Sequence, residues 1–321
     1  QTTAQTKKLK DWDATAFCSY TRYHPFNYIN ADNNWEILQA LQIPATREQL
    51  DSLGIKTTDS QMMLLRIEGL LELQEEGRWK SLLPLLDSIQ TVKTRTYSLE
   101  IATGIYSKIK TDCSTFVKSL QKQNLGENAY SILFSYILDG IAWEKLNSFE
   151  DLKNAATWSG ECWAFYYHRT FSCGTNTYYK EFNVNWTRNQ PEFINKELNT
   201  QTFIKPLIDE YDQQGKITSD ELFNKALSLG IVHNDATLRI PVINSKDKTS
   251  EYNRYADKLT DTIVHHLKDS DIIPHFQQQF NITNEKLSCT ILYHEIIWDL
   301  MDLLTKDEIV TLPSGWVTGD K

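Results

Sequence analysis

Apolar residues in the first part of the chain recur at helical spacing, in short segments separated by capping residues and helix breakers. Asp32, Asn33 and Asn34 precede an apolar segment and predict the N-terminus of a helix over 35–41. Thr46 and Gln49 have the spacing of a capping box, which predicts a second helix over 47–53. A third helix is expected over 60–71, capped by Thr58 or Asp59.

A hairpin is expected directly after these three helices. Leu71 and Leu73 alternate with polar residues, and Glu76 and Gly77 then supply a turn before a second short strand. Three short helices followed by a hairpin resemble a winged helix-turn-helix domain, and the resemblance covers about residues 34–90. It is a resemblance of pattern, and it carries no diagnostic motif.

Longer amphipathic segments follow in both halves of the chain. Helical spacing predicts helices in the first half over 97–120 and 129–146. In the second half it predicts helices over 203–211, 218–230, 255–267 and 287–304, with a strand over 238–244. The fold class expected is mostly α with small β elements.

The two halves correspond at an offset of about 157–161 residues, which predicts an internal duplication. Pro84 corresponds to Pro241 within matching apolar segments, and Tyr97 corresponds to Tyr255 at the start of matching helices. We therefore expect two winged-helix-like halves joined by a connector. The predicted organisation is an N-terminal extension 1–33, a first half 34–150, a connector 151–190 and a second half 191–321.

The connector is rich in aromatic and β-branched residues, which favour strands. Its aromatic and flanking polar side chains are candidates for binding a partner protein or a glycan: Trp158, Trp163, Tyr166, Tyr167, His168 and Arg169. Burial of these rings between the two halves is the alternative. Cys162 and Cys173 flank a predicted turn and would form a disulfide in an oxidising compartment.

The segment Cys162-Trp163-Ala164-Phe165 resembles part of the nucleophile motif of papain-like thiol hydrolases. The resemblance implies a base about 130–150 residues further on, and His294 lies in that window. Ser159 stands where the motif has its first Cys, Ala156 stands where the family has its oxyanion-hole Gln, and no Asn follows His294 to orient it. A papain-like hydrolase that uses Cys162 and His294 is therefore a second alternative for function.

The chain has 321 residues and a net charge of −9, which argues against nucleic acid as a partner. The third predicted helix offers Gln61 and Arg66, opposed by acidic neighbours, and the second half offers Asn224, Lys225 and His233. This set is poor for binding phosphates. The histidines of the second half lack the spacing of a metalloprotease motif, so no metal site is predicted.

We therefore predict a non-enzymatic binding protein without a cofactor. The sequence begins with Gln1 and a small polar segment, and it lacks 18 consecutive apolar residues. These features favour a secreted or periplasmic protein without a transmembrane segment, with a cytoplasmic location as the alternative. An intracellular winged-helix regulator that binds DNA or protein is the first alternative function.

Overall fold

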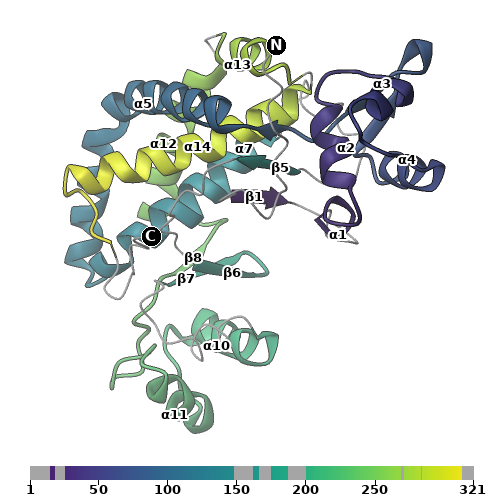
Figure 1. Ribbon diagram of the computed structural model, residues 1–321. Coiled ribbons are helices and arrows are strands. Elements are labelled where there is room, and N and C mark those ends of the chain that lie inside the picture. The colour runs from purple at the N-terminus through teal and green to yellow at the C-terminus, as the bar shows by residue number, and fades with distance from the viewer. Residues whose placement is uncertain are drawn as a thin grey trace. The chain divides into compact units, whose positions relative to one another are not determined.

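The chain is mostly helical with three small sheets (Figure 1). The structure is a computed structural model, and it describes residues 15–18, 26–147, 162–165, 175–186, 200–268, 271–282 and 284–312. These residues belong to two compact units, each assembled from separate segments of the chain. Unit 1 is formed by 1–97, 150–169 and 273–292, and unit 2 by 98–149, 170–272 and 293–321. The expected class, mostly α with small β elements, is confirmed. The internal duplication stays a prediction.

Unit 1 begins with a module of short helices and a hairpin, and local sequence signals start and end its elements. Its helices and strands are α1 (Phe26–Ile29), α2 (Asn34–Ala40), α3 (Arg47–Ser52), α4 (Asp59–Ile67), β2 (Leu71–Leu73), the single turn η2 (Glu75–Gly77) and β3 (Trp79–Ser81). Thr46 and Thr58 both cap their helices in reciprocal capping boxes, as expected for the first of them. The predicted hairpin is confirmed, and Glu76 and Gly77 turn it with φ values of 57° and 70°.

The third helix of this module is shorter than predicted. It ends at Ile67 rather than residue 71, because Gly69 adopts a left-handed conformation with φ of 71°. The Leu70 amide donates to the Leu65 carbonyl and closes this helix end, and Leu71 then starts β2. The isolated antiparallel bridge between Ala45 and Trp79 adds one more short extended position between α2 and α3.

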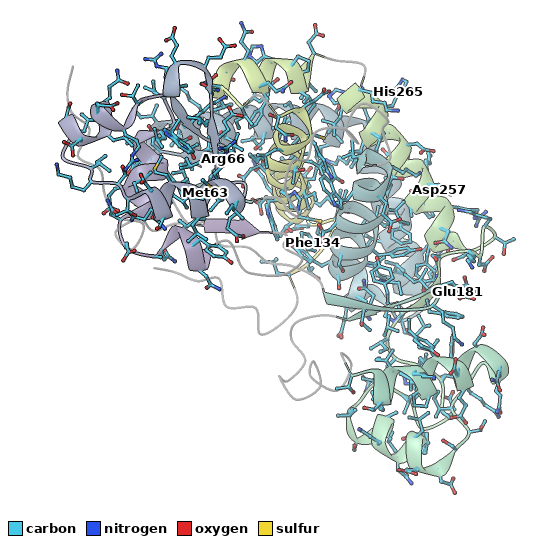
Figure 2. All side chains as sticks on the ribbon, turned by 90° about the vertical axis from the view of Figure 1, so that its right-hand side faces the viewer. Met63, Arg66, Phe134, Glu181, Asp257 and His265 are labelled. Carbon is cyan, nitrogen blue, oxygen red and sulfur yellow. The ribbon has the colours of Figure 1, made fainter. Side chains whose placement is uncertain are left out.

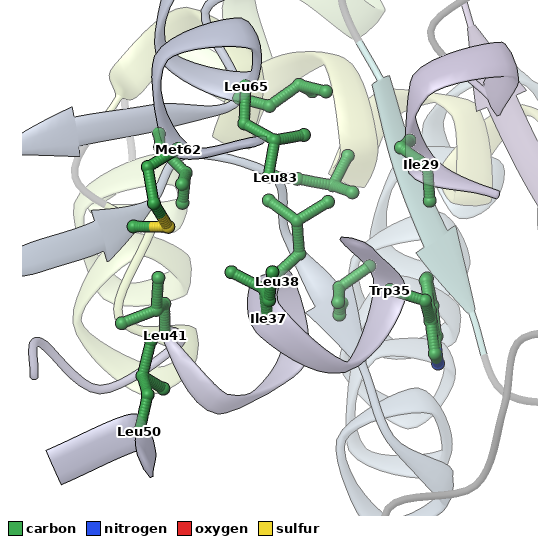
Figure 3. Packing of buried hydrophobic residues seen from close by; sticks show 12 residues of the cluster. Ile29, Trp35, Ile37, Leu38, Leu41, Leu50, Met62, Leu65 and Leu83 are labelled. Atoms are coloured by element: carbon green, nitrogen blue, oxygen red, sulfur yellow. The ribbon is translucent and has the colours of Figure 1, made fainter. Parts of the chain in front are cut away.

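The core of the module is made of side chains from all of its helices (Figure 3). Ile37, Leu38, Leu50 and Leu65 are completely buried there. Apolar burial is the main favourable term for a module of this size, because its helices are too short to be stable alone.

The rest of unit 1 is built from segments that are distant in sequence. Strand β5 (Cys162–Phe165) pairs antiparallel with β1 (Thr15–Cys18) and parallel with β4 (Leu85–Leu86). A helix that the sequence analysis missed, α13 (Ile272–Phe280), also belongs to this unit except for its first residue. Its Phe276 and His275 rings stack with Tyr97, with centroid distances of 6.3 and 5.4 Å.

Unit 2 contains a bundle of long helices. Its elements include most of α5 (Ser88–Lys122), η3 (Gly126–Asn128), α6 (Ala129–Ser131), η4 (Ile132–Ala142), α7 (Trp143–Asn147), α12 (Glu251–Lys268) and the later part of α14 (Glu285–Lys306). Phe134 stacks on Trp298 at 4.7 Å between ring centroids, and Phe116 packs on Tyr255 at 5.1 Å. The sequence predicted helices over 97–120, 129–146, 255–267 and 287–304, but the first of them starts at Ser88 instead of 97, and the single turn η3 was not expected.

A three-stranded sheet in unit 2 packs on two further helices (Figure 1). Its order is β6 (Thr175–Tyr179), β7 (Phe182–Trp186) and β8 (Val242–Asn244), all antiparallel. Phe182 and Val184 lie on one face and share a core with α10 (Gln201–Gln214) and α11 (Asp220–Ser228). The strand predicted over 238–244 is shorter, since Leu238 forms only an isolated bridge with Val232.

The start of α11 is held by a carboxylate from α10. Glu210 accepts hydrogen bonds from the backbone amides of Thr218 and Ser219, each at 2.6 Å. Desolvation acts to raise the pKa of Glu210, but hydrogen bonds from the Thr218 hydroxyl, from the two backbone amides and from the Ser219 hydroxyl together outweigh it and hold the pKa below its usual value. The carboxylate therefore acts as the N-terminal cap of α11.

Replacing Leu65 by Ala should destabilise the module. Its side chain is completely buried, and removal of such a side chain lowers the free energy of unfolding by about 2–5 kcal/mol. Urea unfolding followed by tryptophan fluorescence would measure this change. The matched control is Ile67→Ala in the same helix, where the side chain is 72% exposed and a change within about 0.5 kcal/mol is expected. Equal losses in both variants would contradict the packing described.

Replacing Glu210 by Gln should destabilise the α10–α11 pair in a pH-dependent way. The folded-state pKa of Glu210 is lowered, so its stabilising effect is complete above the ordinary pKa of 4.5 and is lost as the pH falls through the folded value. Unfolding curves of wild type and variant should therefore differ at pH 7 and converge below pH 4.5. A difference that persists unchanged into strong acid would show that Glu210 does not act through its charge.

Candidate functional site

The aromatic binding candidates of the connector fall largely outside the described residues. Outside the described residues are Cys173 of the predicted disulfide and the binding candidates Trp158, Tyr166, Tyr167, His168 and Arg169. Trp163 lies in β5, and the structure describes its backbone and not its side chain. The aromatic platform and the disulfide therefore stay predictions.

Cys162 occupies the first position of β5, paired with Cys18 across the sheet. In the papain-like motif, the nucleophilic Cys starts a helix, so this local structure departs from that family. The two free cysteines whose side chains are described are Cys113 and Cys289, and both are buried. Burial raises the pKa of the Cys113 thiol to about 12, and Asp112 adds to the effect, so this thiol is not a nucleophile at neutral pH.

His294 lies on α14, and its ring contacts the edge of Trp143 at 5.3 Å between centroids. Asp139 of η4 is its charged neighbour. Although the Asp139 carboxylate reaches solvent, the surrounding protein desolvates it and raises its pKa, while the charge of His294 acts in the opposite direction. Sequence spacing could not bring these two residues together, because they are on different helices.

A π-helix supports this part of unit 2. Segment η4 runs for 11 residues with hydrogen bonds that span one residue more than in an α-helix, a rare geometry that is frequent at functional sites. The Tyr293 hydroxyl donates to the Leu138 carbonyl of this segment at 2.7 Å. The Tyr136 hydroxyl donates to Asn253, whose amide in turn donates to the carbonyls of Asn244 and Asp247 at 2.7 Å each.

Two buried asparagines lie on β7, on the face opposite Phe182 and Val184. The Asn185 amide nitrogen donates to the Ser135 hydroxyl of η4 at 3.1 Å. Asn183 lies two residues earlier on the same face and is completely buried, and neither atom of its amide group has a hydrogen-bond partner. Buried amide groups are nearly always bonded, so Asn183 is an energetically costly position.

The exposed face of α4 carries apolar side chains, and Figure 2 labels one of them, Met63. Met63 is 51% exposed and Ile67 is 72% exposed, and Leu64 lies beside them with a smaller exposed fraction. Leu73 is also exposed, on the strand β2 that packs against α4. Met63, Leu64 and Ile67 are close in sequence on one helix, and exposed apolar side chains grouped in this way mark interaction surfaces. We call these four residues the α4 patch.

The polar residues predicted on the same helix contribute little to this face. Gln61 is half-buried, and its side chain is occupied by the capping box and by hydrogen bonds to Asn33 and Asn34 at 2.8 and 3.3 Å. Arg66 is exposed (Figure 2). In the second half, the Lys225 ammonium lies over the Phe203 ring at 4.9 Å, so it is also engaged within the protein.

Acidic side chains surround the α4 patch in sequence. The carboxylates on α4 and on the hairpin that follows are those of Asp59, Glu68, Glu72, Glu75 and Glu76, against the cations Arg66, Arg78 and Lys80, and Asp59 also forms an ion pair with Arg47. Asp59, Glu75 and Glu76 are exposed. The rim of the patch therefore carries a small excess of negative charge, with five carboxylates against three cations.

In the described part of the chain, no group of three or more His, Cys, Asp or Glu side chains is placed to hold a metal ion. One cleft in unit 1 is lined by the end of β3, the segment that leads into α5, and the connection between α13 and α14. Its lining residues come from 80–86 and 280–287, together with Gln42 and Gln90.

Asn183 and Asn185 provide a matched test of the buried polar contacts. Asn185→Leu removes the hydrogen bond to Ser135 and should lower the free energy of unfolding by about 1–3 kcal/mol. Asn183→Leu removes an amide that makes no hydrogen bond, so it should leave this free energy unchanged or raise it. Urea unfolding of both variants measures the difference. A loss at Asn183 as large as that at Asn185 would show that the Asn183 amide is hydrogen-bonded in solution.

A comparison of the chain with protein-family models, with curated proteins and with solved structures finds no match in any of the three. Within the described residues, none of the helices combines the length and the apolar character needed to cross a bilayer. The function therefore has to be argued from the site itself.

Proposed function

We propose that this chain is a binding protein, and that the module of residues 26–81 docks on a protein partner through the α4 patch. The observation that carries the proposal is the apolar character of the exposed face of α4, with Met63 and Ile67 largely open to solvent. Burial of both side chains in a complex would contribute a favourable free energy that the free protein forgoes.

The order of elements supports a winged-helix-like assignment of this module. Helix α2 is followed by the extended position at Ala45, by α3 and α4, and by the hairpin of β2 and β3. In such a domain the third helix is the one that reaches into a DNA groove. Here that helix is α4, so its exposed face decides between nucleic acid and protein as the partner.

The side chains of α4 favour protein. A DNA reader needs exposed Arg, Lys, Asn or Gln on this face, and cations near it for the phosphates. Gln61 is used inside the module, Arg66 is flanked by Met63 and Ile67 on the helix surface, and the rim carries an excess of negative charge. An apolar patch with an acidic rim is instead complementary to an amphipathic helix that has basic flanks.

We accordingly assign the partner as a helical segment with apolar side chains at i, i+3 and i+4 and with Lys or Arg beside them. Apolar anchors would insert against Met63 and Ile67, and the basic flanks would face the carboxylates around Glu75 and Glu76. The charged contacts would mainly speed association and would weaken with salt, whereas the apolar contacts would set the lifetime of the complex.

The test is a binding measurement with a displayed library of amphipathic helical peptides, followed by titration of selected peptides in solution. Basic-flanked peptides should bind the wild type, and Ile67→Glu should weaken binding at least ten-fold because a charge enters the apolar contact. The matched control is Ile89→Glu on α5, where the side chain is 65% exposed and binding should not change.

Three results would contradict the proposal. One is selection of peptides whose binding is the same in wild type and Ile67→Glu. Another is equal affinity for peptides whose flanks are reversed from basic to acidic. The third is tight binding of duplex DNA that depends on Arg66, which would assign the module to nucleic acid.

A further inference from the structure

Helix α5 carries a second exposed apolar surface, separate from the α4 patch. The helix is continuous from Ser88 to Lys122, so the spacing of its residues decides which side chains share a face. Five exposed residues follow one another at alternating intervals of three and four positions, which is the heptad spacing of helices that pack side by side. We call these residues the α5 stripe: Ile89, Val92, Thr96, Leu99 and Thr103.

The two threonines of the α5 stripe are compatible with burial against a partner. The Thr96 hydroxyl donates to the Val92 carbonyl at 2.9 Å, and the Thr103 hydroxyl donates to the Leu99 carbonyl at 2.7 Å. Because both hydroxyls are bonded within the helix, covering them would leave no unpaired polar group. The stripe therefore offers a surface suited to an apolar contact along about 21 Å of helix.

Two opposite charges lie along one edge of the α5 stripe. Lys93 and Glu100 are both exposed, and they lie on the same side of the helix about 10 Å apart along its axis. The residues three and four positions away from each of them on α5 are uncharged. In the described part of the chain, neither side chain forms an ion pair or a hydrogen bond. The two charges therefore do not neutralise each other within one chain.

A second copy of α5 in antiparallel orientation matches both charges at once. A two-fold axis perpendicular to the helix, passing between residues 96 and 97, exchanges the levels of Lys93 and Glu100. Lys93 of each copy then lies at the level of Glu100 of the other, and the apolar side chains of the two stripes meet beside these pairs. In a parallel pair, equal residues lie at the same level, so Lys93 does not meet Glu100.

We propose that two copies of this chain associate through the α5 stripe as an antiparallel pair of helices, with Lys93 of each copy paired with Glu100 of the other. The self-complementary order of the charges favours a second copy over an unrelated helix as the partner. A contact limited to about four turns of helix falls at the low end of protein interfaces, below about 1,200 Å². The association should therefore be reversible and depend on protein concentration.

The test is sedimentation equilibrium of the full chain over a range of concentrations at one ionic strength. The average mass should rise from the 37.3 kDa of one chain toward twice that value. Val92→Glu should weaken the association about ten-fold or more, because each copy brings a carboxylate into the apolar contact. The matched control is Ile43→Glu, an exposed apolar position outside α5, which should leave the association unchanged.

Charge reversal tests the pairing itself. Lys93→Glu and Glu100→Lys each place like charges opposite one another, so each variant alone should associate about five-fold or more weakly than the wild type. An equal mixture of the two variants should recover the association, because each chain then meets the opposite charge on the other. Glu100→Lys also changes the net charge from −9 to −7, so repulsion between whole chains would predict stronger association for this variant.

A mass of 37.3 kDa at every concentration would overturn the proposal, and so would a dimer that Val92→Glu leaves intact. A mixture of the charge variants that associates no better than either variant alone would overturn the antiparallel pairing. Circular dichroism of each variant checks that it is folded. The α4 patch is tested independently, since Ile67→Glu should leave self-association unchanged, whereas Ile89→Glu should weaken it without affecting peptide binding.

Discussion

A helix of nine residues can bury only one stripe of its side chains, and this limit governs the module around α4. The buried stripe holds Met62 and Leu65, which join the core with side chains from α2 and α3. Capping by Thr58 and closure at Gly69 keep the helix short and fix which residues face inward. The same helix geometry leaves Met63 and Ile67 exposed to solvent. The helix register that buries the core residues of the module therefore also determines which apolar residues form its exposed surface.

The sequence was sufficient for the parts of the fold that depend on neighbouring residues. Capping boxes, the turn at Glu76 and Gly77, and apolar residues at helical spacing are local signals, and the structure contains the elements they predict. The end of α4 was misplaced because Leu70 and Leu71 continue the apolar pattern, although the backbone has already turned at Gly69. The periodicity of apolar residues contains no signal for such a change in backbone conformation.

The parts of the site that sequence could not supply depend on long-range contacts. Strand β5 joins β1 and β4 from segments separated by long stretches of chain, and no local pattern specifies those partners. The electrostatic influence of His294 on Asp139 and the walls of the cleft in unit 1 arise in the same way. The connector aromatics were predicted as binding residues from the composition of that segment. The exposed apolar residues of α4, by contrast, have the spacing of ordinary core positions, and only the structure shows that they are exposed.

The buried polar contacts of unit 2 depend on the number of residues in the π-helix η4. Each of its turns contains more residues than an α-helical turn, so the directions of Ser135 and Tyr136 depend on the wide spacing being kept. Deleting one residue would allow a return to better backbone geometry, but it would rotate these side chains away from Asn185 and Asn253. Over evolutionary time, this segment should therefore accept substitutions of its apolar residues much more readily than any change in its number of residues.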